Sequence, residues 1–157
     1  MARILLTTEH VHQPRRRWFP PTADEEREHG AVVGLVAQLY DAALDQCAPC
    51  RQQLLAHVAQ DPSTAGVLAG WACLITSETY GELPWILVEG AERADASFQP
   101  SAAFRIMAAE YDHLGLGPAG LYAVCDVLSD DERLQAAETA LEIVVGLADF
   151  GVDFMFD

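Results

Sequence analysis

Residues Ala31–Val58 read AVVGLVAQLYDAALDQCAPCRQQLLAHV, and this stretch gives the clearest indication of a helical fold. Its apolar residues recur every three or four positions, which is the spacing of one face of an α-helix. The tetrad Cys47-Ala-Pro-Cys50 lies on the same face, so core packing and thiol chemistry compete for those two cysteines. The apolar face consists of Val32, Leu35, Val36, Leu39, Tyr40, Ala43 and Leu44, and continues through Leu54 and Val58.

The composition indicates one folded domain with an acidic surface. The chain has 157 residues, of which 51% are hydrophobic, enough for a sizeable core. The formal net charge is -15, all of it carried beyond residue 30, and every basic residue is an arginine. Such a field repels phosphate backbones and anionic membranes. We therefore expect no direct nucleic-acid or membrane contact, and favour solubility or a partner with a basic surface.

The sequence also favours a cytoplasmic location. Its apolar runs are too short to span a bilayer, and residues 1–10 lack the apolar core and cleavage site of a signal peptide. In the cytoplasm the four cysteines would normally remain reduced.

Residues 1–21 are interpreted as an extended N-terminal arm that ends at Pro20-Pro21. Arg15, Arg16, Arg17 and Trp18 in this arm are candidate contacts for a nucleic acid or an acidic partner. The alternative, which the charge balance favours, is that the arm lies on the acidic body of its own chain.

Residues 22–157 predict a single compact all-α bundle of five to seven helices joined by short Pro/Gly turns. The first helix should run from a capping box at Thr22 to about Gln46, where Pro49 kinks or ends it before a second helical stretch to about Gln60. The later helices are expected to begin at Asp61-Pro62, Pro100, about Leu121 and a second capping box at Ser129. The segment after Pro84 is either a helix, which we favour, or one short strand.

Two of these predicted helices have recognisable faces. The helix after Asp61 is apolar on one side and small on the other, which predicts burial on both sides before Gly81 ends it. The helix after Ser129 ends at Gly151 and has a predicted core stripe. That stripe comprises Leu134, Ala137, Leu141, Val144, Val145 and Ala148.

Cys47 and Cys50 are the candidate catalytic residues. The tetrad resembles the Cys-x-Pro-Cys redox motif of thioredoxin-like proteins, and the resemblance covers these four residues alone. An amphipathic helix precedes the tetrad here, where that family has a β-strand, so its fold is not carried over. A helix that begins near Pro49 would lower the thiol pKa values and favour redox chemistry. The alternative is that both side chains fill the core beside the proline.

A zinc site is a second hypothesis for the same cysteines. Cys47 and Cys50 have zinc-ligand spacing, and His57 shares their face. However, His57 lies about 10 Å beyond Cys50 along a straight helix, so further ligands would have to come from elsewhere in the chain. Two Glu-x-x-His matches, ending at His29 and His113, are predicted to face in different directions and do not form a di-iron site.

The C-terminal segment Val152–Asp157 alternates acidic and large apolar residues. Phe154 and Phe156 could dock in a groove of a partner, or could close the end of the bundle by packing on it.

No phosphate-binding loop, nucleophile elbow or His-Glu-x-x-His helix is present in the sequence. We therefore interpret the chain as a non-catalytic protein–protein interaction or regulatory module, with oligomerisation possible. The alternative is a helical thiol-redox or zinc-binding protein that uses Cys47 and Cys50, with thiol-dependent redox chemistry if it is an enzyme.

Overall fold

The computed structural model describes residues 33–88, 98–114 and 121–154. These residues form helices and no strand, which confirms the predicted all-α class. The predicted arm over residues 1–21 and the first turns of the helix expected from Thr22 lie outside the described residues. The helices are α2 (Val33–Leu44), α3 (Ala48–Gln60), α4 (Pro62–Tyr80), α5 (Trp85–Val88), α6 (Ala102–Leu114), α7 (Tyr122–Val127) and α8 (Asp130–Phe150), followed by the 3-10 turn η2 (Gly151–Asp153).

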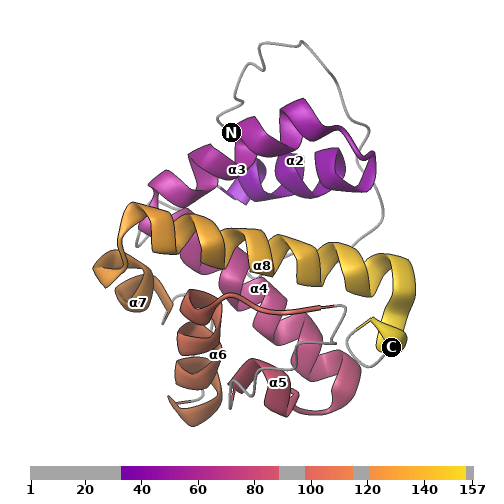
Figure 1. Cartoon of the computed structure of the whole chain (residues 1–157), viewed down its shortest axis with the longest axis vertical. Helices are drawn as coiled ribbons and strands as arrows, with labels where there is room; N and C mark the ends of the chain where they lie inside the picture. The colour runs from indigo at the N-terminus through magenta and orange to yellow at the C-terminus, as the bar shows by residue number, and fades with distance from the viewer. Residues whose placement is uncertain (1–32, 89–97, 115–120, 155–157) are drawn as a thin grey trace.

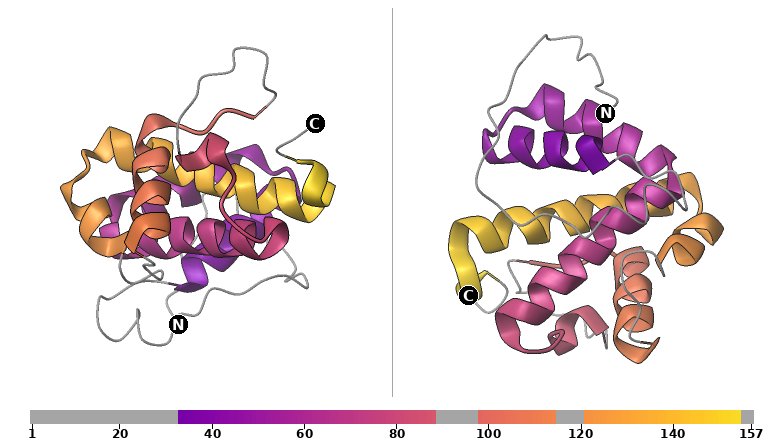
Figure 2. Two further views of the ribbon diagram at one scale, coloured as in Figure 1. Left: turned by 90° about the horizontal axis from the view of Figure 1, so that it is seen from below. Right: turned by 180° about the vertical axis from the view of Figure 1, so that it is seen from behind.

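Two long helices, α4 and α8, cross at the centre of the molecule (Figures 1 and 2). The antiparallel pair α2 and α3 covers one side of this crossing, and α5 and α6 lie on the other side. α7 lies beside the beginning of α8. Within the described residues, none of the helices combines the length and the apolar character needed to cross a bilayer.

The chain reverses direction between α2 and α3. α2 ends at Leu44, and Gln46 takes a left-handed conformation with φ of 56°. Cys47 is then the N-cap of α3, and Pro49 lies in its first turn, where a missing N–H costs no helical hydrogen bond. Pro49 therefore belongs to a new helix, and the first of the two predicted outcomes, a kink within one helix, does not occur.

α4 begins and ends where the sequence predicts. The Asp61 carboxylate accepts hydrogen bonds from the Ser63 N–H (3.3 Å) and from the Thr64 hydroxyl (2.6 Å), with Pro62 in the first turn. Gly81 closes the helix with φ of 84°, a conformation that costs glycine little.

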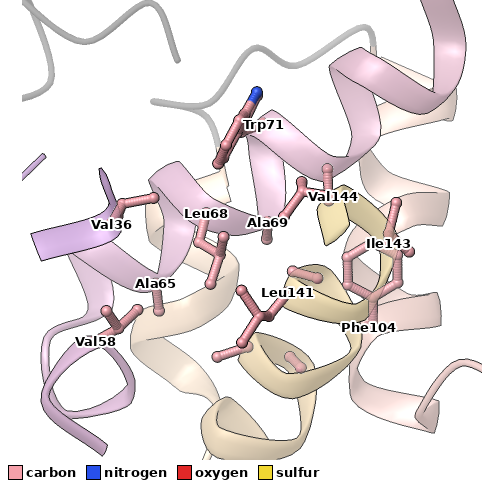
Figure 3. Close-up of a cluster of buried hydrophobic side chains, with 14 of the residues drawn as sticks. Val36, Val58, Ala65, Leu68, Ala69, Trp71, Phe104, Leu141, Ile143 and Val144 are labelled. Carbon is pink, nitrogen blue, oxygen red and sulfur yellow. The ribbon is translucent and has the colours of Figure 1, made fainter. Parts of the chain in front are cut away.

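Both sides of α4 are buried, as its sequence pattern predicts. Residues 63–73 are buried without exception, because α2, α3, α6, α7 and α8 all contact this helix. Figure 3 shows Leu68 directed toward Leu141 of α8, whereas Trp71 points to the other side of α4. There the Trp71 ring meets Tyr40 of α2 edge to face, with ring centroids 5.1 Å apart.

α8 begins at the predicted capping box, but its buried face differs from the predicted stripe. Ser129 accepts from the Glu132 N–H while the Glu132 carboxylate accepts from the Ser129 N–H. Ala137, Leu141 and Val144 are buried as expected, whereas Leu134 and Ala148 are exposed. That part of the prediction is wrong because the surrounding helices cover a face shifted from the most apolar one. The buried face comprises Arg133, Ala136, Ala137, Thr139, Ala140, Leu141, Ile143, Val144, Gly146 and Leu147.

Arg133 is a buried cation that joins the ends of three helices. Its Nε donates to the carbonyl of Ala59 near the end of α3 (3.0 Å). Its Nη1 donates to the carbonyls of Cys125 (3.1 Å) and Leu128 (2.9 Å) at the end of α7. An ion pair with Asp130 completes the set. Carbonyls at helix C-termini lack intrahelical donors and carry partial negative charge, so a guanidinium satisfies both needs.

Replacement of this arginine should destabilise the fold. In Arg133→Met the aliphatic part of the side chain is kept, but three carbonyls lose their charged donor, so the free energy of unfolding should fall by about 3 kcal/mol. Urea denaturation followed by circular dichroism measures the change. Gln135→Ala, an exposed position on the same helix, should stay within about 0.5 kcal/mol of the parent. Equal stability of the two variants would contradict the role assigned to Arg133.

Candidate functional site

The two cysteines of the tetrad differ in exposure. Cys47 is half-buried at the N-cap of α3, whereas Cys50, three residues on, has no exposed surface and belongs to the hydrophobic core. Neither forms a disulfide. Cys50 in this position contributes apolar volume to the core, and its sulfur is out of reach of a substrate in solvent.

The residues proposed for zinc do not gather in one place. His57 is exposed on α3, while Cys50 on the same helix faces the core. Within the described parts of the chain, no group of three or more His, Cys, Asp or Glu side chains is arranged to hold a metal ion.

The two remaining cysteines are also buried, Cys73 on α4 and Cys125 on α7. Desolvation strongly raises the pKa of Cys73, because the interior disfavours a thiolate. Desolvation raises the pKa of Cys125 to about 12, and the positive charge of Arg133 opposes this only in part. Both groups are therefore protonated at neutral pH and poor nucleophiles.

Among the predicted partner-binding residues, Phe154 is the one the structure describes; Arg15, Arg16, Arg17, Trp18 and Phe156 lie outside the described residues. Phe154 is half-buried, because η2 turns the chain back against α8. Its ring lies over Gly146, where a Cβ would overlap it, and contacts Phe98 with centroids 5.0 Å apart. The Tyr80 hydroxyl donates to the Val152 carbonyl (2.8 Å) and holds this turn in place.

Phe98 is held in place from the beginning of α6. The Ser101 N–H donates to Thr139 Oγ1 (3.0 Å), and the Ser101 hydroxyl donates to the Gln135 carbonyl (3.2 Å). These bonds tie the segment before α6 to the middle of α8. Phe98 is thereby buried beside the C-terminal half of that helix.

A cavity of about 650 Å³ lies along this half of α8, and we name it the α8 groove. In Figure 1 the turn between α2 and α3 lies next to the same half of α8. Its volume falls within the range of binding sites for small molecules. The lining residues are Ala43, Arg51, Phe98, Leu141, Glu142, Val145, Gly146, Asp149, Phe150, Asp153 and Phe154.

The charges of the groove are unbalanced. Among the described lining residues, three carboxylates, from Glu142, Asp149 and Asp153, accompany one cation, Arg51. Asp149 lies in the last turn of α8, at the negative end of the helix dipole, and that turn contains no basic residue. An acid at that end is electrostatically unfavourable and would be stabilised by an external cation.

Glu142 is a partly buried carboxylate near Arg51. Desolvation by the groove raises the pKa of Glu142, and the charge of Glu138 adds to this effect. Arg51, across the groove on α3, lowers it. One end of the groove therefore contains its own countercharge.

The other end of the groove is aromatic and open. Phe150 is 66% exposed. Its ring lies nearly parallel to that of Phe154, with an angle of 7° and a centroid separation of 6.4 Å. Asp149 and Asp153 line the groove beside these rings.

Most of this site was missed by the sequence analysis, which named only Phe154. One signal was available: Glu142, Val145, Gly146, Asp149, Phe150 and Asp153 recur at helical spacing. The first five form an acidic and apolar stripe on α8, a helix with no basic residue in its last turn, and Asp153 follows in η2. Arg51 and Phe98 carry no comparable local signal.

Thiol reactivity follows directly from these positions. Under native conditions a small alkylating reagent should modify at most one thiol per chain, that of Cys47, because the other three cysteines are buried. Mass spectrometry before and after unfolding counts the modified residues, and Cys47→Ser should abolish the native reaction. Native modification of two or more thiols would contradict the inward placement of Cys50.

The contact between Gly146 and Phe154 can be tested by a double-mutant cycle. Gly146→Ala should displace the Phe154 ring and lower the free energy of unfolding by about 1–2 kcal/mol despite the better helix propensity of alanine. Phe154→Leu/Gly146→Ala should recover part of that loss, because the smaller side chain can move aside. Additive effects in thermal denaturation would show that the two residues are not in contact.

Comparison of this chain with family models, with curated proteins and with solved structures found no match in any of the three.

Proposed function

We propose that this protein is a non-catalytic interaction module that binds a basic segment of a partner protein in the α8 groove. The observation that carries the proposal is an apolar, partly aromatic groove whose lining, over the part of the chain that the structure describes, has three carboxylates and one cation. A segment with apolar and basic side chains would match such a surface in both respects.

The charge of the whole chain supports a basic partner. The formal net charge of -15 creates a field that speeds the encounter with a positively charged surface. Within the groove, a bound cation would also offset the acid at the negative end of α8. Long-range steering and local pairing therefore favour the same class of partner.

The thiol-redox and zinc alternatives have less structural support. A redox pair needs both sulfurs in turn at a reactive surface, and Cys50 has no exposed surface. We propose a cytoplasmic location on the ground that the four cysteines are thiols, which that compartment maintains.

The proposal can be tested with a synthetic amphipathic peptide of leucine and arginine as the probe. Fluorescence anisotropy should show binding to the full chain that weakens steeply as salt is raised, because the pairing charges become screened. The variant Glu142→Gln/Asp149→Asn/Asp153→Asn should bind about tenfold more weakly than the parent at low salt.

A matched variant controls for net charge. Asp112→Asn/Asp126→Asn/Asp131→Asn removes the same number of charges from exposed positions that do not line the groove. It should retain most of the affinity. Equal loss in both triple variants would mean that the acidic chain attracts the peptide without a site, and absence of binding at low salt would overturn the proposal.

A further inference from the structure

We infer that the C-terminal end of the α8 groove is a pocket for one arginine side chain of the partner, stacked on Phe150 and paired with Asp149 and Asp153. This inference rests on the proposed function and adds to it the identity of the recognised side chain. It concerns the end of the groove formed by the last turn of α8 and by η2.

The distribution of charge along the groove favours binding of the partner's cation at this end. Arg51 acts electrostatically on Glu142, so that end already contains a positive group. Asp149 lies in the last turn of α8 and Asp153 follows in η2, and among the described lining residues Arg51 is the one cation. A positively charged side chain from outside would therefore be favoured beside these two carboxylates.

The aromatic residues select the shape of that cation. Phe150 offers an exposed ring, and the ring of Phe154 lies parallel to it. A cation over the face of an aromatic ring is attracted by the electron density of that face. A planar guanidinium can stack on a ring while its edge donates to a carboxylate, which a compact ammonium group cannot do.

The pocket is held in shape before any ligand arrives. Phe154 is fixed between Gly146 and Phe98, and the bond from Tyr80 to the Val152 carbonyl anchors the turn that carries it. Phe150 and Asp149 belong to the last turn of a 21-residue helix. Preorganised side chains lose little conformational freedom on binding, which favours discrimination between similar ligands.

The remainder of the groove would take an apolar neighbour of the arginine. Leu141, Val145 and Phe98 supply further apolar lining of the groove. A large apolar side chain about one helical turn from the arginine in the partner could reach this surface. The occupant is thus a short amphipathic segment with one arginine close to one apolar anchor.

The test compares two probe peptides that differ only in their cation, one with arginine and one with lysine at every basic position. The parent protein should bind the arginine peptide about tenfold more tightly, because stacking and bidentate pairing are lost with lysine. In Phe150→Leu this ratio should fall to about two, since a leucine keeps apolar area but has no ring.

A control substitution and the pattern of binding results distinguish a failure of the arginine pocket from a failure of the proposed function. Val127→Ala alters an apolar side chain that is 81% exposed and does not line the groove, and should leave the ratio unchanged. Thermal denaturation checks that each variant is folded. Equal affinities of the parent for both peptides would overturn the arginine pocket and leave the basic-partner function intact. Failure of both peptides to bind would overturn the two together.

Discussion

Helix α4 is buried on all sides over residues 63–73, and the arrangement of the other helices follows from this burial. A helix with buried residues throughout 63–73 must have neighbours in every direction, and five other helices supply them. α8 makes the most extensive of these contacts where it crosses α4, and Leu141 and Val144 of α8 face α4 there (Figure 3). The groove lies at the edge of the buried face of α8, because Leu141 and Gly146 of that face line it together with the exposed Glu142 and Asp149. The position of the candidate site is therefore a consequence of core packing.

Local features of the fold could be predicted from the sequence because each depends on a few neighbouring residues. The caps at Asp61 and Ser129 and the left-handed end at Gly81 are of this kind. The buried face of α8 could not be predicted in full, because it depends on which helices surround it. Arg133 shows why: a charged residue is expected at the surface, and its partners are carbonyls on α3 and α7.

The candidate residues also divide into those that neighbouring residues predict and those that meet only in the folded protein. The cysteine tetrad was evident from four consecutive residues, and its place at the start of α3 follows from Pro49. The groove joins Ala43, Phe98 and Phe154, which are far apart in the chain and meet only after folding. Its acidic stripe on α8 could have been read from helical spacing, but that pattern is also typical of an ordinary solvated face. Only the cavity and the exposed ring of Phe150 distinguish the two interpretations.

We propose that this protein binds its partner in the α8 groove. Heteronuclear NMR of the full chain during titration with the arginine peptide tests it most directly, because each backbone amide reports its own surroundings. Binding in the groove predicts that the largest changes in amide chemical shift fall in residues 43–51 and 141–154 and at Phe98. Shift changes concentrated at Arg15–Trp18, or spread evenly over the acidic surface, would contradict it.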